Sequence, residues 1–90
     1  MISNPLTDIE TAVGAVEFLL DFGRAKKDVH DSLARIKLTA TVHSWTEVSA
    51  EVDEALATLA ICDTKEEILG SGLLADLKHI KTLVITEMVA

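Results

Sequence analysis

The apolar positions near the start of the chain repeat with the period of an α-helix. At about 100° per residue, one face collects Ile9, Ala12, Val13, Val16, Leu19 and Leu20. Asn4 before Pro5 is typical of a helix cap followed by proline at the first helical position, while Thr7 to Glu10 forms an alternative capping box one turn later. We therefore expect a first helix that ends near Phe22, with Gly23 as its stop.

Two further apolar stripes predict a second and a third helix. The second stripe consists of Ala25, Val29, Leu33, Ile36 and Ala40, and the third of Val48, Val52, Ala55, Leu56 and Leu59. On one continuous helix these stripes would be rotated by more than about 90°. We therefore expect a break near His43 and Ser44, a cap at Ser44 to Glu47 and a helix from Trp45 to Ile61, although one kinked helix stays an open alternative. Residues 36–42 alternate as a strand would, but a single strand has no partner in so short a chain, so we expect helix there.

The last third of the chain predicts a short helical turn followed by a fourth helix. Asp63 to Glu66 forms a cap for the short turn, and Ser71 between two glycines can cap the next helix. The stripe of that helix is Leu73, Leu77, Ile80, Val84 and Met88. Its end is rich in β-branched residues, which leaves open whether residues 82–88 stay helical. We expect one all-α domain over residues 1–90, a compact bundle of about four helices in antiparallel hairpins, completed by oligomerisation.

Composition adds a reason to expect association. The chain has 49% hydrophobic residues in 90 positions, together with a formal net charge of −7. A domain of this size buries roughly 60–65% of its unfolded surface, so a monomer cannot hide all of these apolar residues. We expect the wide apolar faces of the first and last helices to join copies of the chain or a protein partner. The residues predicted at that interface are Val16, Phe18, Leu19, Phe22, Trp45, Leu77, Val84 and Met88.

Targeting features point to the cytoplasm. Cys62 is the single cysteine, so no internal disulfide can form, and residues 1–11 lack the basic and apolar regions of a signal peptide. The most apolar stretches, residues 12–22 and 73–89, carry charged residues and fall short of the ~20 apolar positions of a membrane span. We expect a cytoplasmic protein without a membrane association, located in the host cytoplasm if the gene is viral.

Three motifs suggest chemistry, and each has a simpler structural interpretation. Gly70 to Ala75 has the G-x-G-x-x-A form of a dinucleotide-binding turn, but too few residues follow it to complete the sheet that this motif requires. Asp76 and His79 have a metal-ligand spacing, whereas a di-iron bundle needs two such motifs. Cys62 lacks the adjacent base that nucleophilic catalysis requires. We expect no enzymatic activity, no catalytic residue, no cofactor and no metal.

Charge is distributed in blocks along the chain. Residues 1–23 sum to −4, residues 24–37 to +3 and residues 46–67 to −6. Such blocks can pair with one another inside a bundle. Alternatively, Arg24, Lys26 and Lys27 form an anion site near a helix start, or Glu47, Glu51 and Glu54 form an acidic surface for a basic partner. The absence of aromatic residues among the cations argues against binding to duplex nucleic acid.

These observations favour a small, non-enzymatic protein–protein interaction module that self-associates through apolar helix faces. An accessory, regulatory, inhibitory or assembly role suits such a module, including one encoded by a virus or mobile element. Two alternatives stay open. The first is an oligomeric binder of a small phosphorylated ligand or nucleotide that uses the basic segment 24–37, and the second is an acidic inhibitor that imitates a polyanion.

Overall fold

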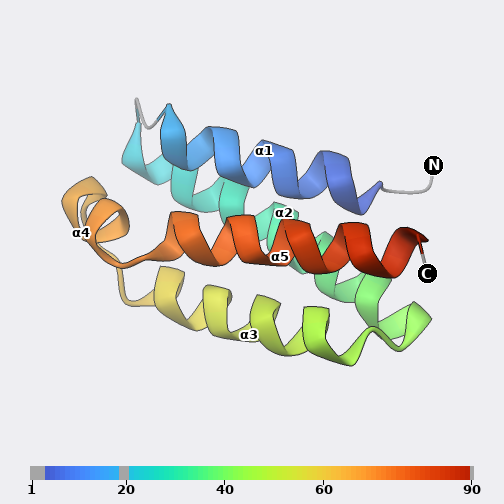
Figure 1. Ribbon diagram of the computed structural model, residues 1–90. Coiled ribbons are helices and arrows are strands. Elements are labelled where there is room, and N and C mark those ends of the chain that lie inside the picture. The colour runs from blue at the N-terminus through green and yellow to red at the C-terminus, as the bar shows by residue number, and fades with distance from the viewer. Residues whose placement is uncertain (1–3, 19–20, 90) are drawn as a thin grey trace.

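Five helices make up the part of the chain that the computed structural model describes, residues 4–18 and 21–89. The helices are α1 (Pro5–Glu17), α2 (Phe22–His43), α3 (Thr46–Ala60), α4 (Lys65–Gly70) and α5 (Leu73–Val89). No strand occurs in these residues. The predicted all-helical class is therefore confirmed, and the short turn expected before Gly70 is the separate helix α4 (Figure 1).

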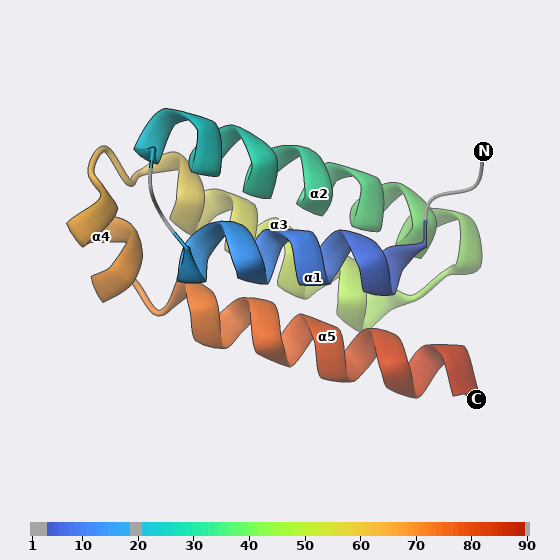
Figure 2. The same ribbon diagram turned by 90° about the horizontal axis from the view of Figure 1, so that it is seen from above.

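The four long helices lie side by side, and each runs antiparallel to its neighbours (Figures 1 and 2). Helix α1 packs against α2 and α5, and α3 packs against the same two helices. Helix α4 lies at one end, while the start of α1 and the end of α5 lie at the other. Each long helix thus has two neighbours, in a compact body of 36 × 24 × 17 Å.

The predicted apolar stripes form the core. Every long helix contributes residues that are at most 2% exposed: Ile9, Ala12, Val16, Val29, Leu33, Ile36, Val48, Val52, Ala55, Leu59, Leu73, Leu77, Ile80 and Val84. Burial of a Val, Leu or Ile side chain stabilises a fold by roughly 1.5–3 kcal/mol. The wide apolar faces that were expected to join copies of the chain are therefore largely buried within a single chain.

The boundary between the first two helices differs from the prediction. Helix α1 ends at Glu17, and Phe22 and Gly23 belong to α2. Asp21 determines this boundary, because its Oδ1 accepts a hydrogen bond of 3.2 Å from the Gly23 N–H and so caps α2. Gly23 is consequently part of a first helical turn rather than a stop. The start of α1 is as expected, with Asn4 Oδ1 accepting from the Leu6 N–H at 2.9 Å and Pro5 following the cap.

The predicted break near Ser44 is confirmed. Ser44 has φ 59° and ψ 36°, the left-handed conformation that ends many helices. The Ser44 N–H donates to the Thr41 carbonyl at 3.3 Å, and the Trp45 N–H donates to the Ala40 carbonyl at 2.8 Å. The expected side-chain cap over residues 44–47 does not form, because Trp45 is the N-cap of α3 and makes no side-chain cap hydrogen bond. The turn therefore rests on these backbone hydrogen bonds and on one that Thr46 Oγ1 donates to the Ser44 carbonyl at 3.5 Å. Residues 36–42 are helical.

Helices α4 and α5 begin with the expected caps. Thr64 Oγ1 accepts from the Glu67 N–H at 3.2 Å, and Ser71 Oγ accepts from the Leu73 N–H at 3.2 Å. Helix α5 continues through its β-branched end to Val89. The hydroxyl of Thr86 donates to the carbonyl four residues earlier at 3.0 Å, a bond that suits Thr inside a helix.

Two turn positions provide a test of backbone strain. Ser44→Gly is expected to raise the free energy of unfolding by about 0.5–1 kcal/mol, because a residue with a Cβ pays roughly 1–2 kcal/mol at φ 59°. The greater freedom of glycine in the unfolded chain offsets part of that gain. Gly72→Ala is expected to lower it by about 1 kcal/mol, because φ at Gly72 is 81° although the space around it is open. Denaturant titration measures both changes. The control is Gly70→Ala, where open space around a helical backbone predicts no loss; a loss there equal to that at Gly72 would contradict the strain explanation.

Candidate functional site

The described residues among those predicted at an association interface do not form one surface. Val16, Leu77 and Val84 are at most 1% exposed and belong to the core, since each long helix is covered by two neighbours. Among the described members, Phe18 at 75% and Met88 at 46% exposure are the large exposed ones. They lie on helix ends at opposite ends of the body. The prediction for Val16, Leu77 and Val84 is therefore corrected.

The remaining three members of that set have different positions. Phe22 and Trp45 are partly buried and pack against the core. The Trp45 ring also stacks on the His43 ring with centroids 5.1 Å apart, beside a shallow hollow at the turn between α2 and α3. Leu19 lies outside the described residues. Neither aromatic residue therefore presents a full face to a partner.

Ion pairs cross three of the four seams between neighbouring long helices. Asp8 pairs with Arg35 across α1–α2, Lys37 with Asp53 across α2–α3, and Glu10 and Glu17 with Lys81 and Lys78 across α1–α5. The basic segment thus pairs with acids of α1 and α3, as expected for charge blocks inside a bundle. Within residues 4–18 and 21–89, no ion pair crosses the fourth seam, α3–α5.

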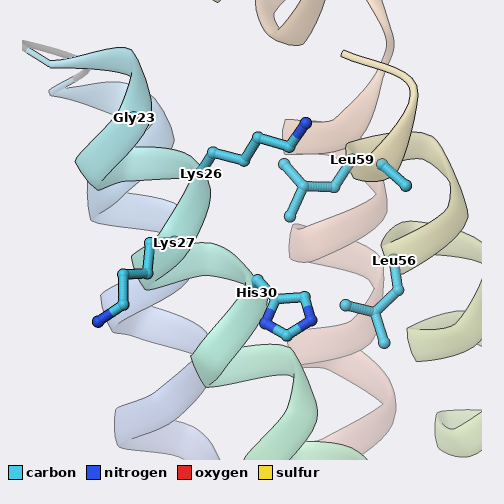
Figure 3. A pocket seen from close by; sticks show the side chains of 7 residues that line it. Gly23, Lys26, Lys27, His30, Leu56 and Leu59 are labelled. Carbon is cyan, nitrogen blue, oxygen red and sulfur yellow. The ribbon is translucent and has the colours of Figure 1, made fainter. Parts of the chain in front are cut away.

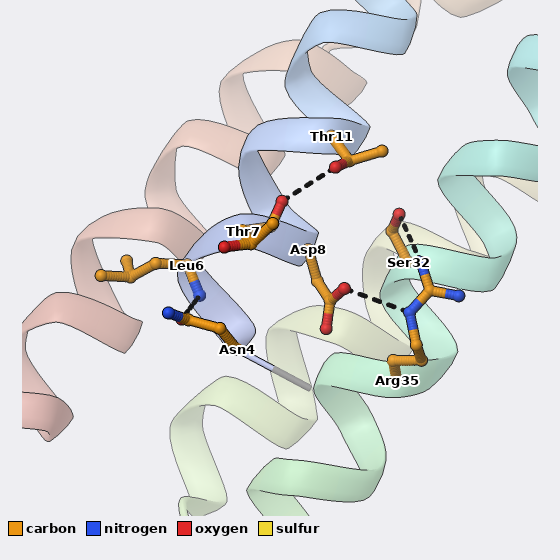
Figure 4. A network of polar contacts seen from close by, with 7 residues as sticks. All are labelled: Asn4, Leu6, Thr7, Asp8, Thr11, Ser32 and Arg35. Carbon is orange, nitrogen blue, oxygen red and sulfur yellow. Dashed lines mark hydrogen bonds and ion pairs between the residues drawn. The ribbon is translucent and has the colours of Figure 1, made fainter. Parts of the chain in front are cut away.

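The Asp8–Arg35 pair is the most buried of these contacts (Figure 4). Arg35 Nε donates to Asp8 Oδ1 at 3.1 Å, and Arg35 Nη2 donates to Ser32 Oγ at 3.4 Å. The side chain of Asp8 is 10% exposed, and its Oδ2 is buried without a hydrogen-bond partner. Arg35 therefore supplies the compensation that a buried carboxylate requires. Sequence patterns missed this pair, because the two residues are far apart along the chain.

The flanks of α3 and α5 that face one another carry acids. Asp53 pairs with α2, and at about 100° per residue the acids Glu47, Glu51 and Glu54 lie within about 60° of one another on the other flank of α3. On α5, Lys78 lies on the flank that faces α1, because it pairs with Glu17. Asp76 and Glu87 lie on the opposite flank of α5. We define the α3–α5 face by Glu47, Glu51, Glu54, Asp76 and Glu87. Figure 1 shows α3 and α5, the two helices that carry it, side by side.

No carboxylate of the α3–α5 face takes part in an ion pair among the described residues. The sequence had indicated the α3 half of this surface. The α5 half was missed, although a helical wheel that separates Lys78 and Lys81 from Asp76 and Glu87 would have found it. The result is an unneutralised acidic strip along one side of the molecule.

A half-open groove of about 280 Å³ lies between the start of α2 and the end of α3. Leu56, Leu59 and Ala60 form its α3 wall, and Gly23, Lys26, Lys27 and His30 form its α2 wall. Figure 3 shows Lys26 extending across the groove, while the ammonium of Lys27 points away from it. Arg24 is exposed and does not line the groove. The three predicted anion contacts therefore do not converge on one point.

The other three candidate motifs have the following geometry in the described residues. No three His, Cys, Asp or Glu side chains there gather around a common metal position. Gly70 to Gly72 join two helices rather than a strand and a helix, which is not the setting of a dinucleotide-binding turn. Cys62 is buried, with its Sγ donating to the Thr58 carbonyl at 3.3 Å. None of the described helices combines the length and apolarity needed to cross a membrane.

No known protein family matches this chain, and comparisons with curated proteins and with solved structures find no match either.

Proposed function

We propose that the protein is a non-enzymatic binding module whose docking surface is the α3–α5 face and whose partner is a basic segment of another protein. The observation that carries this proposal is the pattern of ion pairs. The other three seams between long helices are bridged by at least one pair, whereas the α3–α5 seam in the described part of the chain has acids on both flanks and no bridging cation.

Electrostatics gives this surface a preference among partners. Glu47 and Glu54 are exposed, and Glu51 and Asp76 are half-buried beside the seam. Neighbouring carboxylates repel one another, and a partner that brings lysine or arginine side chains relieves that repulsion. Complementary charge of this kind increases association rates and disfavours acidic partners. An inhibitory or regulatory role that occupies the basic site of a target protein is consistent with this chemistry.

The proposal differs from the leading sequence hypothesis in its docking surface, which is acidic rather than apolar. Self-association through the first and last helices is not part of it, because Val16, Leu77 and Val84 are core residues. Binding of a phosphorylated ligand by Arg24, Lys26 and Lys27 also receives no support from the geometry, since only Lys26 extends over the groove (Figure 3).

Charge removal on the α3–α5 face tests the proposal. The probe is a lysine-rich helical peptide, titrated into isotope-labelled protein and followed by NMR chemical shifts. We expect the shifts to map to α3 and α5, and the triple variant Glu47→Gln, Glu51→Gln, Glu54→Gln to weaken binding roughly tenfold. Three charge contacts at the surface, of about 0.2–1 kcal/mol each, together give a change of that size. Added salt is expected to weaken binding further.

The matched control removes three other acids. The control variant carries Asp63→Asn, Glu66→Gln and Glu67→Gln, which change the net charge by the same amount. These three residues are exposed and lie in or just before α4. This variant is expected to bind the peptide nearly as well as the unmodified protein. Equal losses in the two triple variants would show that only net charge matters, and shifts spread over all helices would remove the α3–α5 face as a docking surface.

A further inference from the structure

The groove between α2 and α3 has a polar contact beside it, where the Lys26 ammonium donates to the Cys62 carbonyl at 2.7 Å. The α3 wall of the groove is apolar, and the His30 ring lies on its α2 side (Figure 3). A concave, mainly apolar site with a few placed polar groups is the usual form of a small-molecule pocket.

Lys26 is an unusual cation in this chain. Lys27, Arg35, Lys37, Lys78 and Lys81 each have a carboxylate partner. Among the cations of the described residues without one, Arg24 and Lys65 are exposed, but Lys26 is half-buried. Its ammonium is held by the Cys62 carbonyl and lies 5.8 Å from the centre of the Phe22 ring. A positioned cation at an apolar groove therefore lacks its counter-charge.

The donor count of Lys26 leaves room for a ligand. An ammonium has three N–H donors, and the Cys62 carbonyl accepts one of them. The other two are available to an anion in the groove. One ammonium without a second converging cation suits a singly charged group better than a phosphate, because Arg24 is outside the groove and Lys27 points away and pairs with Asp31 at 3.8 Å.

We propose that this groove binds a small carboxylate with an apolar body, such as a medium-chain fatty acid. The carboxylate accepts hydrogen bonds from Lys26, and the hydrocarbon lies on Leu56, Leu59 and Ala60. The groove volume of about 280 Å³ is near the lower limit of roughly 300 Å³ for ligand pockets, which restricts the ligand to a short chain. This site is separate from the α3–α5 face and does not depend on it.

Octanoate is the probe, with octanol and inorganic phosphate as comparison ligands. Octanoate is expected to shift the amide signals of residues 23–30 and 56–62 in the full chain. Octanol lacks the charge and phosphate lacks the apolar body, so each is expected to bind at least about tenfold more weakly. This difference corresponds to about 1.4 kcal/mol, the size of one hydrogen bond to a charged group. Equal binding of octanoate and octanol would overturn the assignment of a carboxylate to Lys26. Equal binding of octanoate and phosphate would overturn the assignment of a hydrocarbon to the apolar wall.

Three variants localise the site. Lys26→Met is expected to weaken octanoate binding about tenfold. Lys65→Met removes an exposed lysine that does not line the groove, and it is expected to leave binding unchanged. Ala60→Leu keeps every charge and fills the groove from an exposed position, so it is expected to abolish binding. Equal effects of the two lysine variants, or unchanged binding in Ala60→Leu, would contradict the proposed site. Circular dichroism confirms that each variant is folded, and the comparison of the three ligands requires no variant.

Discussion

Leu77→Ala is expected to lower the free energy of unfolding by about 2–5 kcal/mol, the range for truncation of a fully buried leucine. Leu77 is 0% exposed in the core between α5 and its neighbours. Truncation removes apolar contacts and leaves a cavity that a close-packed interior does not fill. Thermal and denaturant unfolding measure the change. A loss of this size is a large fraction of the stability of a small domain.

Phe18→Ala is the matched comparison for Leu77→Ala. Both residues were predicted on the same interface, but Phe18 is 75% exposed. Its truncation is expected to change stability by no more than about 0.5 kcal/mol, as for most surface substitutions. Similar losses in the two variants would mean that Phe18 is covered, and a loss at Phe18 that grows with protein concentration would restore self-association as a hypothesis.

Arg35→Met is expected to lower the free energy of unfolding by about 1–3 kcal/mol, the cost of leaving a buried polar group without its partner. Methionine keeps most of the apolar stem of the side chain and removes the guanidinium. Asp8 then loses the hydrogen bond at Oδ1, while its Oδ2 already has no partner. The half-exposed position of Arg35 keeps the expected loss below that of a fully buried ion pair.

Two comparisons separate this effect from a general loss of charge. Lys37→Met breaks an exposed pair with Asp53, and its expected cost is at most about 1 kcal/mol. Adding Asp8→Ala to Arg35→Met removes the isolated carboxylate, so the double variant is expected to be more stable than Arg35→Met alone. Additive losses in this double-mutant cycle would show that Asp8 and Arg35 do not interact energetically.

Local sequence signals predicted the helix boundaries well where a side chain caps a helix only a few residues away. Asn4, Thr64 and Ser71 cap the helices that the sequence indicated, because a side-chain oxygen reaches a backbone N–H within two or three residues. The prediction that Gly23 ends the first helix was wrong. The carboxylate of Asp21, two residues earlier, begins α2 there instead.

The candidate sites could be predicted only in part. The helical wheel identified Glu47, Glu51 and Glu54 as one acidic strip. Their lack of cationic partners depends on the direction in which α5 presents Lys78 and Lys81, and both lysines face α1. The groove likewise requires two helix walls from distant parts of the chain, so no pattern within the basic segment could distinguish Lys26 from Lys27.

The sequence by itself determined that the chain is helical, where most helices begin and end, and which face of each helix is apolar. These properties follow from periodicity and capping, which act over a few residues. Only the tertiary structure decided what covers those faces, which charges are neutralised and where a groove forms. The reason is physical: the hydrophobic effect is non-directional, so an apolar stripe is stabilised by burial against any apolar surface. Which helix covers the stripe depends on packing between residues that are far apart in the sequence.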